Sequence, residues 1–239
     1  MERLETDVLV IGGGSGGLSV AAGAVQMGAR VVLLEGHKMG GDCLNYGCVP
    51  SKALLAAAAV AHGQGGNAAM GVGPGKNTVS YGKAKDFVAS VIDQIAPHDS
   101  VERFEGLGVT VIEDYGHFIS PTEVQAGERV ITARRIVIAT GSSPFVPPIP
   151  GLSEVPYYTN ETIFDLRARP DHLLIIGGGP IGMEMAQAHR RLGSKVTVIE
   201  GQQVFAKDDP ELAAILVQKL RDEGIEIVEG ALAQSVSGT

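Results

Sequence analysis

Thr6-Asp-Val-Leu-Val-Ile11 runs directly into Gly12-Gly-Gly-Ser-Gly-Gly17, and this stretch decides the fold. The apolar run is rich in β-branched residues and predicts a strand, while the glycines predict a tight turn. Leu18 to Met27 then predicts a helix, and Arg30 to Leu34 predicts a second strand that ends at Glu35. The order strand, turn, helix, strand is that of a βαβ unit.

The same pattern occurs again later in the chain. His172 to Ile176 predicts a strand, Gly177 to Gly182 a turn, and Lys195 to Ile199 a second strand that ends at Glu200. In both copies the Glu lies 23 residues after the first Gly. The repeat therefore predicts an α/β protein with two Rossmann-like dinucleotide-binding domains, each built on a parallel sheet.

A proline-rich segment separates the two copies. Five of the 12 prolines fall within residues 144–156, where neither helical nor strand periodicity is seen, so we predict an extended linker. We expect a first domain over residues 1–150 and a second over residues 151–239. Copy one ends its last apolar strand at Gly141, 33 residues after Gly108; the matching distance from Gly224 exceeds the chain, which predicts an incomplete second domain.

Turn-forming and helix-capping residues within the copies predict where several helices and strands begin or end. Turn signals at Ser120-Pro121 and Ala126-Gly127 predict a hairpin, and Pro97 is expected to kink or end a helix. Asp208 or Asp209 with Pro210 predicts the start of the final helix. Six glycines between Gly63 and Gly75 predict a flexible loop.

Composition excludes several classes of protein. The net charge of -8, without a basic run, argues against nucleic acid or an anionic membrane as partner. Two cysteines are too few for a secreted disulfide scaffold, which favours the cytoplasm. We expect no membrane-spanning helix, because glycines interrupt the most apolar stretch and the next, Leu54 to Ala61, is far shorter than about 20 residues.

The two glycine turns point to nucleotide binding. A glycine turn lets backbone N–H groups approach a pyrophosphate, and a carboxylate at the end of the next strand can accept both ribose hydroxyls. A chance glycine turn is the alternative, but the strand, helix and Glu recur with each set. Glu200 repels a 2'-phosphate and no Arg or Lys follows within Gly201 to Gln203, so NADH is favoured over NADPH. The binding residues are Gly12, Gly14, Gly17 and Glu35 in the first copy and Gly177, Gly179, Gly182 and Glu200 in the second.

Both cysteines lie in the segment Gly40 to Lys52. Helical residues five apart are about 8.6 Å apart, beyond the roughly 7 Å that a disulfide can bridge, so a Cys43–Cys48 bond requires a distorted turn. Asn45, Gly47 and Pro50 permit such a turn. A zinc half-site lacks further ligands at suitable spacing, so no metal site is expected. Two buried thiols and a strained redox disulfide remain open from the residues alone.

At this point the sequence resembles the pyridine nucleotide-disulfide oxidoreductases, a family of flavoenzymes. The segment Cys43 to Lys52, with Gly40 and Gly41 before it, is similar to the redox-active motif of the mercuric reductase and dihydrolipoamide dehydrogenase branches. Ala139-Thr-Gly-Ser142 resembles the second flavin-binding motif, and the second glycine turn resembles the nicotinamide site. The resemblance covers essentially the whole chain.

The resemblance implies a role for each motif. The first glycine turn, Glu35, Gly41, Asp42, Thr140 and Gly141 would hold FAD. Cys48 would stack against the flavin, and Cys43 would meet the substrate. Lys52 would pair with Glu184 beside the flavin. Asp42 stands where many members have Thr, and Pro180 where many have a Tyr that gates the nicotinamide.

The implied function is an FAD-dependent oxidoreductase. Electrons would pass between NAD(P)H, FAD and a Cys43–Cys48 disulfide, and then a small-molecule disulfide, a dithiol or a thiol-bound metal ion. Family members dimerise through a C-terminal domain that supplies a His base and would lie beyond Thr239, so we expect a homodimer at full length and little or no turnover from these 239 residues. The alternatives are a non-catalytic nucleotide-binding module or truncated remnant, and a transhydrogenase-like relative that needs no disulfide.

Overall fold

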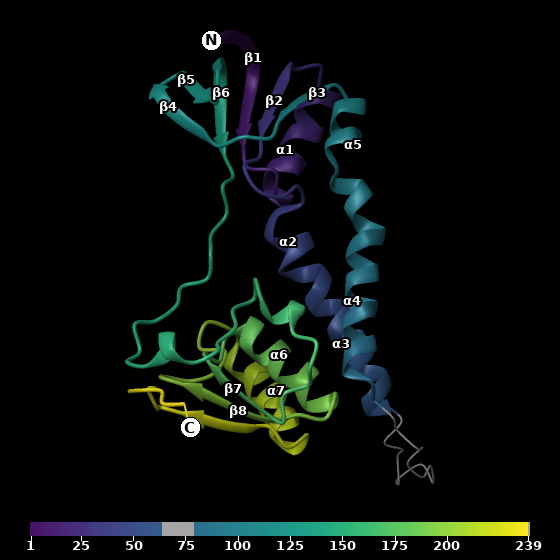
Figure 1. The fold of residues 1–239 in the computed structure, drawn as a ribbon, viewed down its shortest axis with the longest axis vertical. Helices are drawn as coiled ribbons and strands as arrows, with labels where there is room; N and C mark the ends of the chain where they lie inside the picture. The colour runs from purple at the N-terminus through teal and green to yellow at the C-terminus, as the bar shows by residue number, and fades with distance from the viewer. Residues whose placement is uncertain (64–78, 239) are drawn as a thin grey trace. The chain divides into compact units, whose positions relative to one another are not determined.

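The computed structural model describes residues 1–63 and 79–238, and these form two compact α/β units (Figure 1). The first unit contains Met1–Pro50 and Ser90–Pro144, and the second contains Ser51–Ala89 and Phe145–Thr239. Each unit is therefore assembled from two stretches of chain. The predicted division at residue 150 stays a prediction, and the loop predicted between Gly63 and Gly75 lies, after its first residue, outside the described residues.

A six-stranded sheet forms the centre of the first unit. Its order is β3-β2-β1-β6-β5-β4, with parallel pairs from β3 to β6 and antiparallel pairs along β6, β5 and β4. The hairpin predicted from the turn signals is thus confirmed. The strands are β1 (Glu2–Ile11), β2 (Val31–Leu34), β3 (Val109–Ile112), β4 (Gly116–Ser120), β5 (Glu123–Ala126) and β6 (Arg129–Ile138).

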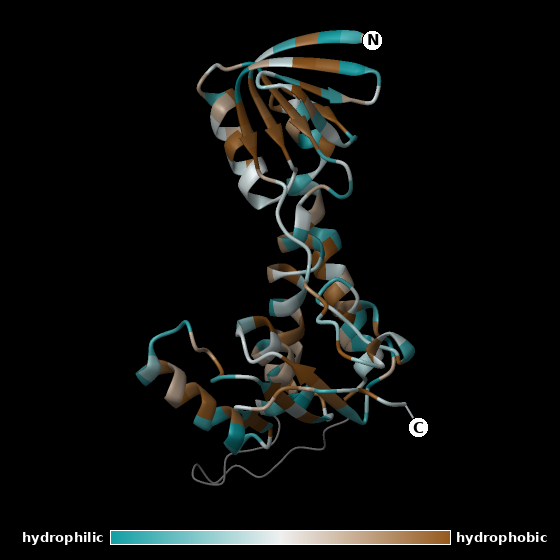
Figure 2. Ribbon diagram, turned by 90° about the vertical axis from the view of Figure 1, so that its left-hand side faces the viewer, coloured by the Kyte–Doolittle hydropathy of each residue, from teal (hydrophilic) through white to brown (hydrophobic). Residues whose placement is uncertain are grey.

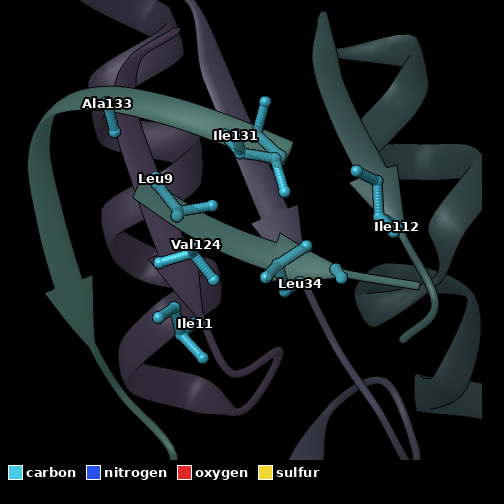
Figure 3. Close-up of a cluster of buried hydrophobic side chains, with 9 residues drawn as sticks. Leu9, Ile11, Leu34, Ile112, Val124, Ile131 and Ala133 are labelled. Carbon is cyan, nitrogen blue, oxygen red and sulfur yellow. The ribbon is translucent and has the colours of Figure 1, made fainter. Parts of the chain in front are cut away.

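Apolar side chains alternate between the two faces of this sheet. On one face Val10 and Leu33 pack against α1 (Ser15–Gln26) and α5 (Val101–Gly106). On the other face Leu9, Leu34 and Val124 belong to a cluster that joins β1 and β2 to the antiparallel strands (Figure 3). Figure 2 shows the hydrophobic colouring concentrated on the central strands. The parallel strands are therefore covered on both faces, as their near-continuous apolar sequences require.

The second unit has a parallel three-stranded sheet of order β7-β8-β9. Its helices α6 and α7 pack on one face, where Met183, Val198 and Leu220 are buried together. Asp209 caps α7 by accepting from the backbone N–H of Glu211 and Leu212, as predicted. The predicted α/β class with two Rossmann-like units is confirmed. The elements are β7 (His172–Ile176), α6 (Pro180–Arg191), β8 (Lys195–Glu200), α7 (Pro210–Asp222) and β9 (Glu226–Glu229).

Between β2 and β3 the described residues form three helices in addition to α5. α2 (Gly41–Asn45) is followed by α3 (Cys48–Gly63) and then by α4 (Tyr81–Ile95), which ends at a 3-10 turn, η2 (Ala96–Asp99), that contains Pro97. Two short 3-10 turns, η3 (Leu152–Glu154) and η4 (Ile163–Asp165), lie between β6 and β7. Pro97 therefore ends the helix as predicted.

One run in this region corrects the expectation that no stretch is long enough to cross a membrane. By length and composition alone, Gly41–Gly63 meets that criterion, and 33% of its apolar window is buried in the structure. The run includes the break at Tyr46 and Gly47 between α2 and α3. The many alanines in this run raise its mean hydropathy, although the helix is interrupted.

Candidate functional site

The first glycine turn is closed by backbone contacts that leave no space for side chains. A Cβ on Gly17 would lie 1.8 Å from the carbonyl oxygen of Gly12. The carboxylate of Glu35 accepts from the backbone N–H of Gly13 and of His37, both at 2.7 Å. Glu35 is thus fixed at the carboxyl end of β2, beside the turn.

Helix α1 begins at this turn with its backbone N–H groups available to a ligand. Its N-cap is Gly14, no side chain caps it, and its first turn contains no acid. Such a helix start attracts an anion through its N–H groups and its dipole. The glycines of the turn, the uncapped start of α1 and the fixed carboxylate of Glu35 together fit the ADP half of FAD.

Two other sequence-predicted cofactor segments lie against the same turn. A Cβ on Gly41 would lie 2.6 Å from the Cα of Gly14, and Gly40 donates its N–H to Gly13 at 2.9 Å. Ala139 donates to the carbonyl oxygen of Ile11 at 2.8 Å, which brings the exposed Thr140 and Gly141 to the end of β1. The structure therefore gathers Gly12, Gly14, Gly17, Glu35, Gly41, Thr140 and Gly141 in one region.

The second glycine turn repeats this geometry. Glu200 accepts from Gly178 N–H at 2.7 Å and from Gln202 N–H at 2.9 Å, and these hydrogen bonds hold the pKa of Glu200 below its usual value. A Cβ on Gly182 would lie 2.3 Å from the carbonyl oxygen of Gly177. Helix α6 starts after Gly179, with Pro180 as its first residue. This turn fits a second dinucleotide, with one backbone donor fewer than α1 because Pro has no N–H.

The cysteines lie on either side of an irregular bend. Cys43 is in α2, Cys48 is the first residue of α3, and Tyr46 and Gly47 separate the two helices. The amide of Asn45 donates to the carbonyl oxygens of Met39 at 3.1 Å and Gly41 at 2.9 Å, which holds the bend in place. The distorted turn predicted from the cysteine spacing is present.

The thiol of Cys48 influences the titration of Cys43 across this bend. Burial raises the pKa of Cys43 to about 11, assisted by its hydrogen bond to Cys48 and, to a smaller extent, by the negative charge of Asp42. Cys43 is half-buried and Cys48 is exposed. No disulfide joins the two cysteines in the structure.

The carboxylate of Asp42 lies over the bend. A Cβ added to Gly47 would fall 2.7 Å from Oδ2 of Asp42, and Tyr46 donates its N–H to the carbonyl oxygen of Asp42 at 2.8 Å. The assignment of Asp42 to the cofactor site stays a prediction. Its side chain lies against Gly47, the residue that precedes Cys48.

Lys52 and Glu184 form the ion pair that the family resemblance implied. The Nζ of Lys52 lies 2.5 Å from Oε1 of Glu184, which joins α3 to α6. The two side chains are 62% and 32% exposed. An ion pair with this exposure contributes little to stability, so its geometry is of more interest than its energy.

A buried polar cluster in the second unit was not found from the sequence. Tyr81 and His189 hydrogen-bond at 3.0 Å, and His189 Nδ1 lies 2.8 Å from the carbonyl oxygen of Met185. A carbonyl only accepts, so Nδ1 carries the proton and Tyr81 donates to Nε2. Lys85, which is 2% exposed, donates to the carbonyl oxygen of Ile163 at 2.7 Å.

Burial dominates the titration of this cluster. It lowers the pKa of His189 to about 4 and that of Lys85 to about 8, and it raises the pKa of Tyr81 to about 12. No sequence signal connects residues 108 positions apart, such as Tyr81 and His189. Within residues 1–63 and 79–238, no group of three or more His, Cys, Asp or Glu side chains is arranged to hold a metal ion.

Comparison with known proteins identifies relatives over nearly the whole chain. Residues 6–239 match the family described as pyridine nucleotide-disulphide oxidoreductase. Mercuric reductase from Bacillus cereus is 34% identical over 96% of this chain and 37% of its own length, and that from Acidithiobacillus ferrooxidans is 35% identical over 98% and 44%. The chain thus spans less than half the length of these relatives.

The solved structures give the same result. The Cu(II) complex of the HOCl-induced flavoprotein disulfide reductase RclA from Escherichia coli superposes with a TM-score of 0.83 and 28% identity. This match covers 98% of the present chain and 51% of that one. A Cu(II) complex of the C43S mutant of the same reductase has the same TM-score.

Proposed function

Because this chain belongs to the pyridine nucleotide-disulphide oxidoreductase family, we propose that it carries the dinucleotide and dithiol sites of an FAD-dependent reductase of the mercuric reductase type. The observation that carries the proposal is the junction in the first unit. There, Gly41, two residues before Cys43, packs against Gly14 of the first glycine turn. Dinucleotide cradle and redox bend are thus one continuous piece of structure.

In this proposal the first unit binds FAD. The N–H groups at the start of α1 would hold the pyrophosphate, Glu35 would accept from the adenosine ribose, and Thr140 and Gly141 would close over the cofactor. When bound, FAD carries two electrons between the nicotinamide and the cysteine pair. Gly12 and Gly17 leave the space that this approach requires.

The cysteine pair stores the two electrons. Two electrons and two protons would convert a Cys43–Cys48 disulfide into two thiols. Cys43 then attacks a substrate disulfide, and Cys48 resolves the mixed disulfide, so that two substrate thiols leave and the protein disulfide forms again. Lys52, held by Glu184, is the cation that favours charge on the flavin side of the pair.

The second unit binds the nicotinamide dinucleotide at its own glycine turn. Glu200 is ionised and fixed by Gly178 and Gln202, which favours the ribose hydroxyls of NADH over the phosphate of NADPH. This preference is part of the proposal, as are a homodimer at full length and a cytoplasmic location.

Two substrate classes are consistent with the relatives. The mercuric reductases suggest a thiophilic metal ion held by the two thiols, and the flavoprotein disulfide reductase suggests a disulfide, although its structure is a Cu(II) complex. The second candidate function is a nucleotide-binding module without redox chemistry. It would need the glycine turns but not the bend between the two cysteines.

The experiment is a count of thiols in the FAD-loaded chain. The oxidised protein should show no accessible thiol, and NADH under anaerobic conditions should expose two, as measured by maleimide labelling and intact mass. Cys43→Ser and Glu105→Gln are the matched variants: the first should remove the response and the second should keep it. A chain that binds FAD but gains no thiol on NADH addition contradicts the redox function and favours the module.

Steady-state activity is a separate measurement. We expect little or no NADH oxidation by these 239 residues with lipoamide, glutathione disulfide or mercuric ion, even where the single reduction of the cysteine pair proceeds. Brisk turnover would contradict that expectation but not the assignment of the cysteine pair.

A further inference from the structure

The redox bend contains an acid whose carboxylate spans it. Asp42 immediately precedes Cys43, and its Oδ2 would be 2.7 Å from a Cβ on Gly47, the residue immediately before Cys48. One negative charge therefore lies against the bend that separates the two cysteines. Its field acts on the Cys43 thiol.

The other charged groups near the bend have identified contacts. Glu35 accepts from two backbone N–H groups, and His37 lies 3.2 Å from the hydroxyl of Tyr46. Lys38 is held over the ring of Tyr46, 5.1 Å from its centroid. Asp42 is thus the acid in direct contact with the bend, and two cations partly oppose it: Lys38, and Lys52, which follows Cys48 on α3 and is paired with Glu184.

We propose that Asp42 is a specificity-determining residue that makes the Cys43–Cys48 pair select cationic over anionic substrates. A fixed negative charge in the bend that carries the reacting sulfurs attracts an approaching cation and repels an anion. The inference rests on the proposed function, because it assumes that substrates meet this pair. It separates the two substrate classes by charge: metal cations and cationic disulfides are favoured, and acidic disulfides are disfavoured.

The test uses three small disulfides of different charge on the reduced chain, without FAD or NADH. Cystamine is dicationic, hydroxyethyl disulfide is neutral and dithiodiglycolate is dianionic. Each oxidises the pair by the same exchange: Cys43 or Cys48 attacks the probe, one probe thiol leaves, and closure of the protein disulfide releases the second. The intrinsic reactivity of the protein thiols cancels in the ratio of rates, which isolates the electrostatic effect.

We expect Asp42→Asn to lower the ratio of cystamine to dithiodiglycolate rates by about three- to tenfold at low ionic strength. Salt should lower the ratio of the unmodified chain toward that of the variant, because screening acts on the same charge. Glu105→Gln removes an equal charge from α5 and should leave the ratio unchanged. The salt series requires no variant and so does not depend on folding of Asp42→Asn.

Two outcomes overturn the inference: an unchanged ratio in Asp42→Asn, or a ratio in the unmodified chain that does not respond to salt. Neither bears on the proposed function, provided that the pair reacts with the neutral disulfide. If the pair fails to close with any of the three probes, the proposed redox function fails instead. The two failures are therefore distinguishable within one experiment.

Discussion

The two glycine turns share a backbone but differ in what surrounds them. Gly12 and Gly177 have the same φ of 111°, and each donates its N–H to the end of the neighbouring strand, at 2.8 and 2.9 Å. A Cβ on Gly12 would meet the carbonyl oxygen of Ala139 at 2.2 Å, whereas a Cβ on Gly177 would meet no atom of the described residues within 4 Å. The similar local sequences thus give the same backbone turn, but the atoms packed around the two turns differ.

A second difference follows five residues after each Glu. Gly40 and Phe205 both adopt a positive φ, 82° and 55°, and both donate an N–H to the middle glycine of their turn, at 2.9 and 3.0 Å. After Gly40 the first copy continues into the cysteine bend, while after Phe205 the second continues into α7. This shared backbone contact is therefore the point where the two copies diverge, and the two cysteines lie in only one of them.

The largest expected effect comes from adding a methyl group to the equivalent glycines. Gly12→Ala should destabilise the first unit by about 4 kcal/mol or more, because backbone atoms of Ala139 cannot move away. Gly177→Ala should cost only about 1–2 kcal/mol, the price of a positive φ. Hydrogen exchange of peptides from β1 and β7, read by mass spectrometry, measures both. Equal losses in the two units would show that the turns are equivalent after all.

The sequence repeat predicted both glycine turns. It did not predict which residues pack around each turn. Glycine spacing, strand composition and the Glu that lies 23 residues after the first Gly fix the turn because they are local requirements of the backbone. Pro97 and Asp209 likewise act on their own helix ends. The bend between the cysteines was predictable for the same reason, since spacing alone excludes a regular helix.

Other features depend on contacts that a single sequence does not encode visibly. Lys85 and His189 carry polar side chains and would ordinarily be assigned to the surface, but both are buried where α4 meets α6. The positive φ of Phe205 has no signal, because a bulky residue rarely adopts it. The sequence does not say which way the Asp42 carboxylate points. The structure shows that it lies against Gly47.

The second prediction concerns what each helix buries beneath its turn. Helix α1 buries Gly17, Leu18 and Ala21, whereas α6 buries His189, which stays neutral because burial lowers its pKa to about 4. As pH falls below about 6.5 the unfolded chain takes up a proton that the folded chain refuses, so stability is lost. The second unit should lose about 2 kcal/mol between pH 7 and pH 5.

The measurement is urea unfolding of the second unit at several pH values. His189→Gln should remove the pH dependence in this window whatever its effect on stability at pH 7. Lys85, with its pKa lowered to about 8, and Tyr81, with its pKa raised to about 12, titrate outside this window. A slope that persists in His189→Gln would assign the acid sensitivity to another group.

The third prediction separates the two carboxylates by ligand. Glu200→Gln should raise the affinity for NADPH relative to NADH by about tenfold, because the charge that repels the 2'-phosphate is removed. Glu35→Gln, which weakens the equivalent hydrogen bonds to Gly13 and His37, should lower FAD affinity and leave the NADPH to NADH ratio unchanged. Fluorescence titration with each nucleotide measures both. A ratio that moves in Glu35→Gln would mean that the turns do not divide the two ligands as proposed.

The smallest effect tests the positive φ that Gly40 and Phe205 share at the backbone hydrogen bond to each turn. At most positions Gly is less stable than Ala by about 0.5–1 kcal/mol, but at a positive φ the order reverses because Ala incurs a steric cost. Phe205→Gly should therefore be more stable than Phe205→Ala by about 0.5–1 kcal/mol, since both lose the same packing against the core of the second unit.

A matched pair on α7 supplies the reference for this last comparison. Leu212 is 68% exposed, and Leu212→Gly should be less stable than Leu212→Ala by about 1 kcal/mol, the ordinary helical order. Thermal unfolding of the four variants gives both differences. Opposite signs at the two positions would mean that the backbone at Phe205 is constrained as at Gly40, with Phe205 retained for its side chain. If Gly were less stable than Ala at both positions, the backbone at Phe205 would not be constrained as it is at Gly40.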